Sequence, residues 1–206
     1  MSVQPLRHGS GQAAVFLDRD GTLIEDIGYI GRADQVTLYP WTVRSIVAFN
    51  RARLPVVVIT NQSGVARGYF TEAAVVEVHR HLTSVVEADG ARIDAYYHCP
   101  HHPEGTVDAY TRRCDCRKPG RGLIDRATAD LGLDATKSYV VGDKWVDVAL
   151  ARAVGAKALL VRTGYGADQE THPCPDVTPD AVCDNLGAAT HWILNDLQSL
   201  IIKGEC

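Results

Sequence analysis

Residues 13–22 read AAVFLDRDGT, a short apolar run that ends in two aspartates, a glycine and a threonine. A run of five apolar residues closed by polar turn residues is typical of a buried central β-strand. In open α/β sheets, ligands bind outside the carboxyl ends of the strands. We therefore expect residues 13–17 to form the first strand of such a sheet, and Asp18 and Asp20 to lie in a ligand site.

Further apolar runs alternate with segments of helical period along the chain. This alternation predicts a three-layer α/β fold, in which helices cover both faces of a parallel sheet. The other expected strands are residues 55–60, 93–97, 138–141 and 157–161, with an edge strand at 181–183. The expected helices are residues 43–53, 71–88, 122–131, 146–154 and 186–201. Residues 21–40, 99–120 and 163–180 interrupt the alternation, and long loops in such domains are usually functional.

Length and composition indicate one compact domain. The 206 residues are 46% hydrophobic and 22% charged, which is enough for a sizeable core. We expect a single domain over residues 13–203 and a flexible tail over residues 1–12. The formal net charge is -4, and no basic run concentrates positive charge, which argues against a nucleic-acid partner. Since no apolar run is long enough to span a bilayer, we expect a cytoplasmic protein without a membrane partner. Nothing in the sequence suggests an obligate interface, so we also expect a monomer.

The two aspartates after the first strand suggest two different catalytic roles in phosphoryl transfer. One carboxylate can attack phosphorus and form a covalent intermediate. The other can protonate the departing alkoxide and then activate water. We expect Asp18 to be the nucleophile and Asp20 the general acid and base.

Polar residues also follow two other predicted strands. Thr60-Asn61-Gln62-Ser63 offers a hydroxyl and backbone amides for phosphate oxygens, although the same residue types are common in turns. Asp143 is placed to complete a Mg²⁺ site with Asp18 and the carbonyl of Asp20, because magnesium prefers carboxylates, phosphate oxygens and water. Asp147 either supports that site or is an acid favoured at a helix start.

Three cysteines and a histidine form a candidate zinc loop. The motifs are Cys99-Pro-His101 and Cys114-Asp-Cys116, and Arg117 and Lys118 follow directly. Four such ligands suit tetrahedral zinc and leave no open position for water, so the zinc would be structural. It would fix where the two cationic side chains point. Cys174, Cys183 and Cys206 fit no pattern and are expected to be free thiols, and His79 and His81 are expected at the surface.

Taken together, these motifs resemble the haloacid dehalogenase (HAD) superfamily of phosphotransferases. Asp18 and Asp20 match its first motif, Thr60 the second, Lys118 the third, and Asp143 with Asp147 the fourth. The resemblance implies a HAD-like Rossmannoid fold and an aspartyl-phosphate intermediate. It also implies that Thr60 and Lys118 stabilise the phosphoryl group. The connections after the first two strands are too short for a large cap domain.

From about Ala13 to Ile201 the chain is similar to one family of that superfamily, the D-glycero-D-manno-heptose 1,7-bisphosphate 7-phosphatases. The resemblance implies Mg-dependent removal of the C7 phosphate from a small phosphosugar, in the synthesis of nucleotide-activated heptose for lipopolysaccharide. It implies zinc ligation by Cys99, His101, Cys114 and Cys116. It assigns substrate recognition to Arg117. The implied substrate contacts also include Asp18, Arg19, Asp20, Asp26, Ile27, Gly28, Tyr29, Thr60, Asn61, Gln62, Ser63, Lys118 and Lys144.

Two alternatives stay open. Histidinol-phosphate phosphatases share the aspartates and a similar zinc loop, but their loop is typically shorter than the twelve residues from His102 to Arg113 here. A phosphosugar-binding module without turnover would require the loss of a catalytic residue, and none is lost. The Thr-Asn-Gln motif also resembles polynucleotide 3'-phosphatases, but the acidic balance weighs against DNA.

Overall fold

The computed structural model of the chain describes residues 11–203, with only the backbone of residues 201–203. Within those residues, six parallel strands form one sheet in the order β3-β2-β1-β4-β5-β6. The strands are β1 (Val15–Leu17), β2 (Val56–Asn61), β3 (Ala95–Cys99), β4 (Tyr139–Gly142), β5 (Lys157–Val161) and β6 (Ala181–Cys183). Each expected strand is present: β5 and β6 have the expected bounds, and the ends of the other four differ from expectation by at most two residues. The predicted α/β fold class is confirmed.

The order of the strands reverses beside β1. The chain runs outward from β1 through β2 to β3, then returns to place β4 on the other side of β1. Such a topological switch point leaves a crevice at the carboxyl ends of the neighbouring strands. The ends of β1, β2 and β4 therefore meet at one place, where Asp18 follows β1, Thr60 lies near the end of β2 and Asp143 follows β4. Arg117 and Lys118 come from the loop between β3 and α3.

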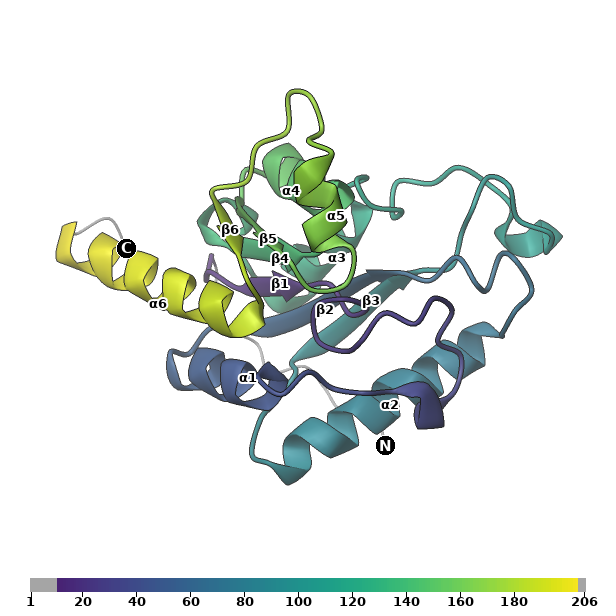
Figure 1. The fold of residues 1–206 in the computed structure, drawn as a ribbon, viewed down its shortest axis with the longest axis horizontal. Helices are drawn as coiled ribbons and strands as arrows, with labels where there is room; N and C mark the ends of the chain where they lie inside the picture. Colours follow the sequence, from purple (N-terminus) through teal and green to yellow (C-terminus); the bar gives the residue numbers. More distant parts are fainter. Residues whose placement is uncertain (1–10, 204–206) are drawn as a thin grey trace.

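Helices cover both faces of the sheet (Figure 1). They are α1 (Thr42–Arg51), α2 (Glu72–Ala88), α3 (Gly122–Leu131), α4 (Trp145–Val154), α5 (Gly166–Thr171) and α6 (Leu186–Lys203). The hydroxyl of Thr71 accepts a hydrogen bond from the amide of Ala74 and caps α2. Helix α5 was expected to be loop, because its six residues GADQET carry no apolar stripe that periodicity could detect.

Alternate residues of the strands divide the core into two layers. Val15 and Leu17 pack with the apolar side chains of α1, α2 and α6. Phe16, between them, packs with those of α3 and α4. All three side chains are fully buried, and each such burial contributes roughly 1.5–3 kcal/mol. A strand covered on both faces has no polar alternation, which explains the apolar run in the sequence.

Two residues that were assigned to the N-terminal tail contact the folded domain. Residues 1–10 and 204–206, with Cys206, lie outside the described residues. Gly11 and Gln12, which were assigned to the tail, are tied to the loop after α3. The amide of Gly11 donates to the carbonyl of Gly132, and Gln12 forms a parallel bridge with Leu133.

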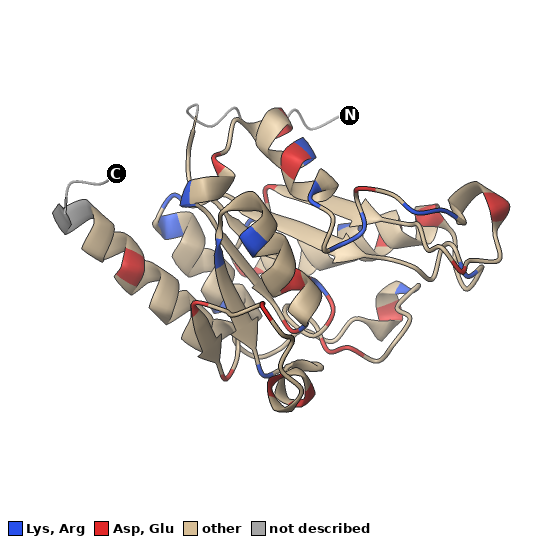
Figure 2. Cartoon of the chain, turned by 90° about the horizontal axis from the view of Figure 1, so that it is seen from above, with Lys and Arg blue, Asp and Glu red and all other residues tan. Residues whose placement is uncertain are grey.

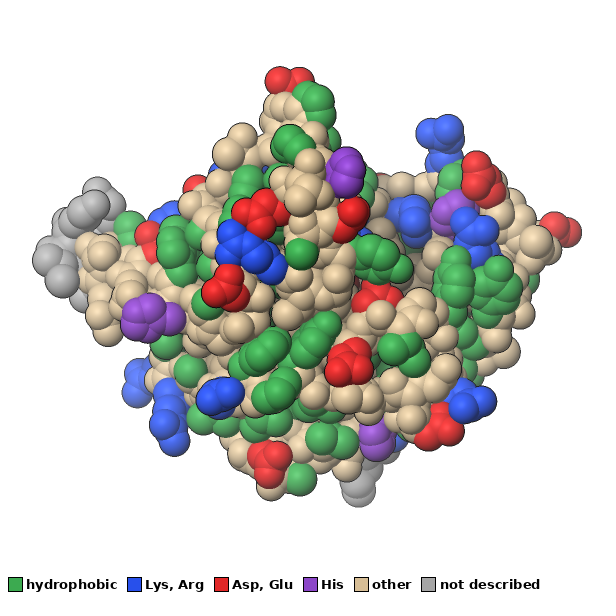
Figure 3. Space-filling model, viewed as in Figure 1, with side chains coloured by type: hydrophobic (Ala, Val, Ile, Leu, Met, Phe, Trp, Pro, Cys, Tyr) green, Lys and Arg blue, Asp and Glu red, His purple; other side chains and the backbone are tan. Residues whose placement is uncertain are grey.

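The connection from β1 to α1 spans residues 18–41 and contains only a short 3-10 helix, Ala33–Gln35. No helix among residues 11–203 is long and apolar enough to cross a membrane. Basic and acidic residues are spread over the whole cartoon (Figure 2). Charged side chains of both signs are also interspersed on the face shown in Figure 3.

The expectation for His79 was wrong. Its side chain is buried between α2 and the sheet, where it stacks on the ring of Tyr96 at 4.6 Å between centroids. The burial of His79 was not predicted, because a histidine in an amphipathic helix can lie on the buried or the exposed face and the sequence analysis did not assign the face.

Candidate active site and metal centre

A cavity of about 420 Å³ opens at the carboxyl ends of β1, β2 and β4. Most of the predicted substrate-contacting residues line it: Asp18, Asp20, Asp26, Gly28, Tyr29, Thr60, Asn61, Gln62, Ser63, Arg117, Lys118 and Lys144. Arg19 and Ile27 do not line it. Gly64, Val146 and Tyr165 line it without having been predicted. Tyr165 follows β5 in a glycine-containing turn, and this position at a strand end is the signal that could have identified it.

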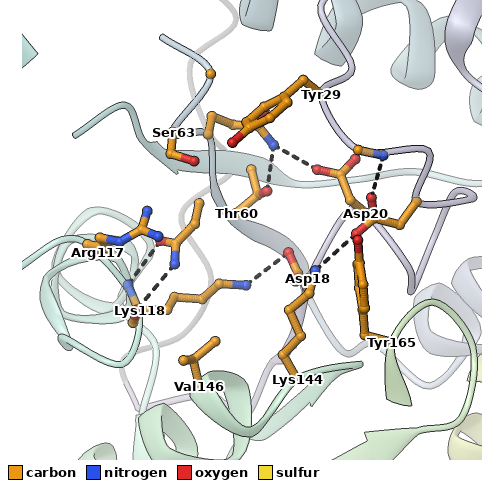
Figure 4. A pocket seen from close by; sticks show the side chains of 15 residues that line it. Asp18, Asp20, Tyr29, Thr60, Ser63, Arg117, Lys118, Lys144, Val146 and Tyr165 are labelled. Atoms are coloured by element: carbon orange, nitrogen blue, oxygen red, sulfur yellow. Dashed lines mark hydrogen bonds and ion pairs between the residues drawn. The ribbon is translucent and has the colours of Figure 1, made fainter. Parts of the chain in front are cut away.

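One buried lysine, Lys118, contacts Asp18 at the carboxyl end of β1 (Figure 4). The Nζ of Lys118 lies 2.9 Å from Oδ1 of Asp18 and 2.6 Å from Oδ1 of Asp147. It also donates to the carbonyl of Ile59 at 3.1 Å. Burial acts to lower the pKa of Lys118, but the charges of Asp147 and Asp18 outweigh it and raise this pKa. The ammonium is therefore held charged beside the expected nucleophile.

Three buried carboxylates gather next to that ammonium. Oxygens of Asp18, Asp143 and Asp147 all lie within 4.8 Å of one another. Burial, followed by the charge of Asp18, raises the pKa of Asp143 to about 7. Burial likewise raises the pKa of Asp147 to about 6, against the lowering effect of Lys118. Oδ1 of Asp143 is buried without a hydrogen-bond partner among the described residues. This oxygen-rich, charge-crowded cluster fits a hard divalent cation.

The backbone of two glycines, Gly21 and Gly164, packs against the carboxylate of Asp143. A Cβ on Gly21 would lie 2.2 Å from Oδ2 of Asp143, and one on Gly164 would lie 2.3 Å from the same oxygen. Both glycines have positive φ, +81° and +56°. Only glycine lets the backbone approach this carboxylate so closely in that conformation.

The carboxylate of Asp20 is not part of this cluster and is bound by Arg19 and Gln62 instead. Its Oδ1 accepts from Nε of Arg19 at 2.9 Å, and its Oδ2 accepts from Nη2 of Arg19 at 3.0 Å. Oδ2 also accepts from the amide of Gln62 at 2.9 Å. The same amide nitrogen donates to the hydroxyl of Thr60 at 2.8 Å. The sequence analysis assigned the carbonyl oxygen of Asp20, and not this carboxylate, to the magnesium site, and that assignment stays a prediction.

Two further cationic side chains, those of Lys144 and Arg117, line the cavity, and the Nζ of Lys144 lies 3.7 Å from Oδ2 of Asp143. The Nζ of Lys144 is 3.0 Å from Oδ2 of Asp26 and 4.6 Å from the centre of the Tyr165 ring. Burial acts to lower the pKa of Lys144, but Asp143, Asp18 and Asp26 outweigh it and raise this pKa. Arg117 also lines the cavity, and its Nη1 donates to the carbonyl of His101 at 3.4 Å.

The four predicted zinc ligands form one cluster. The sulfur of Cys116 lies 3.3 Å from the sulfurs of Cys99 and Cys114, which are 3.5 Å apart. Nδ1 of His101 lies 3.3 Å from the sulfur of Cys116. Tetrahedral zinc with Zn–S bonds of about 2.3 Å would separate its sulfurs by about 3.8 Å, close to this spacing. The three thiols and one imidazole fit a closed zinc site.

The zinc loop is joined directly to the cavity. The amide side chain of Asn61, at the end of β2, accepts from the backbone N–H of Lys118 at 3.0 Å and donates to the carbonyl of Lys118 at 3.2 Å. This pair of hydrogen bonds fixes the backbone of Lys118 against the strand end. Asn61 was predicted to contact substrate, and the structure shows it also has this scaffolding contact.

Comparisons with known proteins agree with this geometry. A family model described as HAD-hydrolase-like matches residues 115–189. The D-glycero-beta-D-manno-heptose-1,7-bisphosphate 7-phosphatase of Haemophilus ducreyi is 38% identical over 84% of this chain and 96% of its own. The enzyme of the same name from Escherichia coli K12 is also 38% identical, over 91% of each chain.

A solved structure is similar as well. It is the D,D-heptose 1,7-bisphosphate phosphatase from B. bronchiseptica, described as complexed with magnesium and phosphate. Its TM-score is 0.79 at 29% sequence identity, and the match covers 90% of this chain and 99% of that one.

Proposed function

Since the chain belongs to the D-glycero-beta-D-manno-heptose-1,7-bisphosphate 7-phosphatase family of HAD-like hydrolases, we propose that it removes the C7 phosphate of the β-anomer of this bisphosphate. One observation supports this most strongly. A single cavity holds the Asp18–Lys118 pair and two further cationic side chains, those of Arg117 and Lys144. A bisphosphate offers one anionic group to each.

At the reacting end, Asp18 attacks phosphorus while the bond to the C7 oxygen breaks. Asp20 delivers a proton to the departing alkoxide. Lys118 and the hydroxyl of Thr60 hold phosphoryl oxygens, because both line the cavity next to Asp18. Water then attacks the aspartyl phosphate and gives its proton to Asp20, which restores Asp18 and releases phosphate.

Magnesium is the proposed catalytic ion. Asp18, Asp143 and the carbonyl of Asp20 would hold it, and the unpartnered Oδ1 of Asp143 is the oxygen best placed to do so. When bound, magnesium neutralises charge between the attacking carboxylate and the phosphate. Asp147 has a different role, because its carboxylate already holds Lys118 in place.

Zinc is the proposed structural ion. Cys99, His101, Cys114 and Cys116 would bind it, and four protein ligands leave no position for a reacting water. The ligand Cys116 is followed directly by Arg117 and Lys118, so a fixed metal centre fixes both cationic side chains. The carbonyl of the ligand His101 also accepts from Arg117.

The C1 phosphate is the proposed partner of Arg117 and Lys144. A guanidinium binds phosphate through two parallel hydrogen bonds, and the ammonium of Lys144 adds a point charge. Asp26 neutralises Lys144 in the structure described here, and the second phosphate would compete for that ammonium. A substrate with a single phosphate would gain less binding energy from Arg117 and Lys144.

The test is a comparison of kcat/KM with magnesium on three substrates: the two anomers of heptose 1,7-bisphosphate, and histidinol phosphate. Asp18→Asn serves as the blank. The proposal expects the β-anomer to be preferred and all turnover to be lost in Asp18→Asn. Preference for histidinol phosphate would overturn the substrate, and turnover that survives in Asp18→Asn would overturn the nucleophile.

A further inference from the structure

Arg19 stands between the two catalytic aspartates in the sequence, yet its side chain does not enter the cavity. Its exposed fraction is 0%, which makes it one of the largest fully buried side chains of the described chain. Burying a guanidinium costs several kcal/mol unless it is paired with good geometry. Among residues 11–203, the one carboxylate that pairs with it is that of Asp20.

The pairing restricts Asp20 in two ways. Nε and Nη2 of Arg19 bind the two carboxylate oxygens side by side, and such a planar fork fixes the orientation of a carboxylate. The backbone is fixed as well, because the carbonyl of Arg19 accepts from the amides of Thr22, Leu23 and Ile24. Neither the side chain of Asp20 nor its turn is free to rotate independently of Arg19.

Gln62 holds the same carboxylate from the carboxyl end of the neighbouring strand, β2. Its amide nitrogen donates to Oδ2 of Asp20 and to the hydroxyl oxygen of Thr60. A hydroxyl that accepts from Gln62 keeps its own hydrogen free to donate elsewhere. The cavity next to Thr60 is where the phosphoryl group would lie. One amide group therefore links the acid–base residue to the phosphoryl-binding hydroxyl (Figure 4).

We propose that Arg19 and Gln62 are positioning residues that set the orientation of the Asp20 carboxylate for proton transfer to the leaving group. In this role neither Arg19 nor Gln62 contacts substrate, although the family resemblance assigned both residues to substrate binding. The inference rests on the proposed function in one respect, that Asp20 is the general acid. It does not depend on which alkyl phosphate is the natural substrate.

The leaving group distinguishes positioning from a structural role. An alkoxide needs a proton as it departs, whereas p-nitrophenolate leaves without one. The variants are Arg19→Lys, which keeps the charge but loses the fork, and Gln62→Ala, which removes the amide at the edge of the cavity. Each is compared with wild type by kcat/KM on heptose 1,7-bisphosphate and on p-nitrophenyl phosphate, because kcat/KM reports the steps up to loss of the leaving group.

For Arg19→Lys we expect about a 100-fold loss on the alkyl substrate, within the range that acid catalysis contributes, and little change on p-nitrophenyl phosphate. For Gln62→Ala we expect a smaller loss with the same bias. In an Asp20→Asn background, Arg19→Lys should cost nothing further on the alkyl substrate. Equal losses on both substrates, or a further loss in the Asp20→Asn background, would overturn the proposal.

The controls separate this inference from the proposed function. If wild type cleaves another alkyl phosphate better than heptose 1,7-bisphosphate, the substrate assignment fails, and the same comparison is made with that ester. If wild type cleaves p-nitrophenyl phosphate but no alkyl phosphate, then Asp20 delivers no proton and the positioning role is overturned. Gln62→Ala keeps the test decisive if Arg19→Lys does not fold.

Discussion

The ammonium of Lys118 lies 2.6 Å from Oδ1 of Asp147, and both side chains are 1% exposed. This pair joins the zinc loop, through Lys118, to the start of α4, where Asp147 lies. The same ammonium contacts Asp18, which directly follows β1. A single buried cation thus holds together three segments that are far apart in the sequence, and the catalytic geometry depends on it.

Removal of this cation is expected to cost both stability and activity. Lys118→Met leaves the buried carboxylates of Asp18 and Asp147 without their partner, which typically costs about 3–5 kcal/mol. Urea unfolding at neutral pH measures this loss. Lys137→Met removes an exposed ion pair with Asp134 and should cost under about 1 kcal/mol. Similar losses for the two variants would contradict the account of Lys118.

Gly164→Ala is expected to disturb the proposed magnesium site. Its Cβ would lie 2.3 Å from Oδ2 of Asp143, at a backbone φ of +56°. We expect the magnesium concentration for half-maximal activity to rise and kcat to fall. The control is Gly90→Ala, whose φ is +78° but whose Cβ would meet nothing within 4 Å. Gly90→Ala carries only the backbone strain, about 1–2 kcal/mol, and should leave the magnesium dependence unchanged.

The cysteine cluster is expected to bind one zinc ion per chain. Cys114→Ser should lower the zinc content measured by atomic spectroscopy and weaken activity, since Arg117 and Lys118 lose their fixed support. Cys174→Ser, which alters a free cysteine outside the cluster, should keep both at the wild-type level. Full zinc content in Cys114→Ser would show that this sulfur is not a ligand.

His79 is expected to make the fold acid-sensitive. Burial, then the charges of Arg19 and His98, lowers its pKa from 6.5 to about 2. Between these values the unfolded chain binds a proton that the folded chain does not, so stability falls as the pH falls below 6.5. A single such group contributes a slope of about 1.4 kcal/mol per pH unit there.

His79→Phe removes that slope and keeps a flat ring to pack on Tyr96. Urea unfolding from pH 7 to pH 5 should therefore show a weaker pH dependence than wild type. His191→Phe replaces an exposed histidine of α6 and should retain the wild-type dependence. An unchanged slope in His79→Phe would contradict the buried, neutral state of this imidazole.

The sequence was sufficient to predict the sheet, because its strands are covered on both faces and form apolar runs such as residues 13–17. It also placed the site, since polar residues follow β1, β2 and β4, and the carboxyl ends of these strands meet at the switch point. The helix α5 was missed because its residues carry no apolar period.

Side-chain partners were much harder to predict. Nothing in the spacing of Asp147 indicates that it would bind Lys118 rather than support the metal site directly, because the two residues come together only through tertiary packing. The family resemblance assigned Arg19 to substrate together with Asp18 and Asp20, but of these three only Asp18 and Asp20 line the cavity. The burial of Arg19 depends on how the turn after β1 folds back, and residue order alone does not reveal that.

The central claim is that Asp18 carries out magnesium-dependent removal of the phosphate at C7 while the phosphate at C1 stays in place. Phosphorus NMR of D-glycero-β-D-manno-heptose 1,7-bisphosphate during turnover tests it directly. The account predicts that the C7 monoester signal is replaced by inorganic phosphate and the C1 signal persists, with no change for Asp18→Asn. Loss of the C1 signal first, or no loss of either in the presence of magnesium, would contradict it.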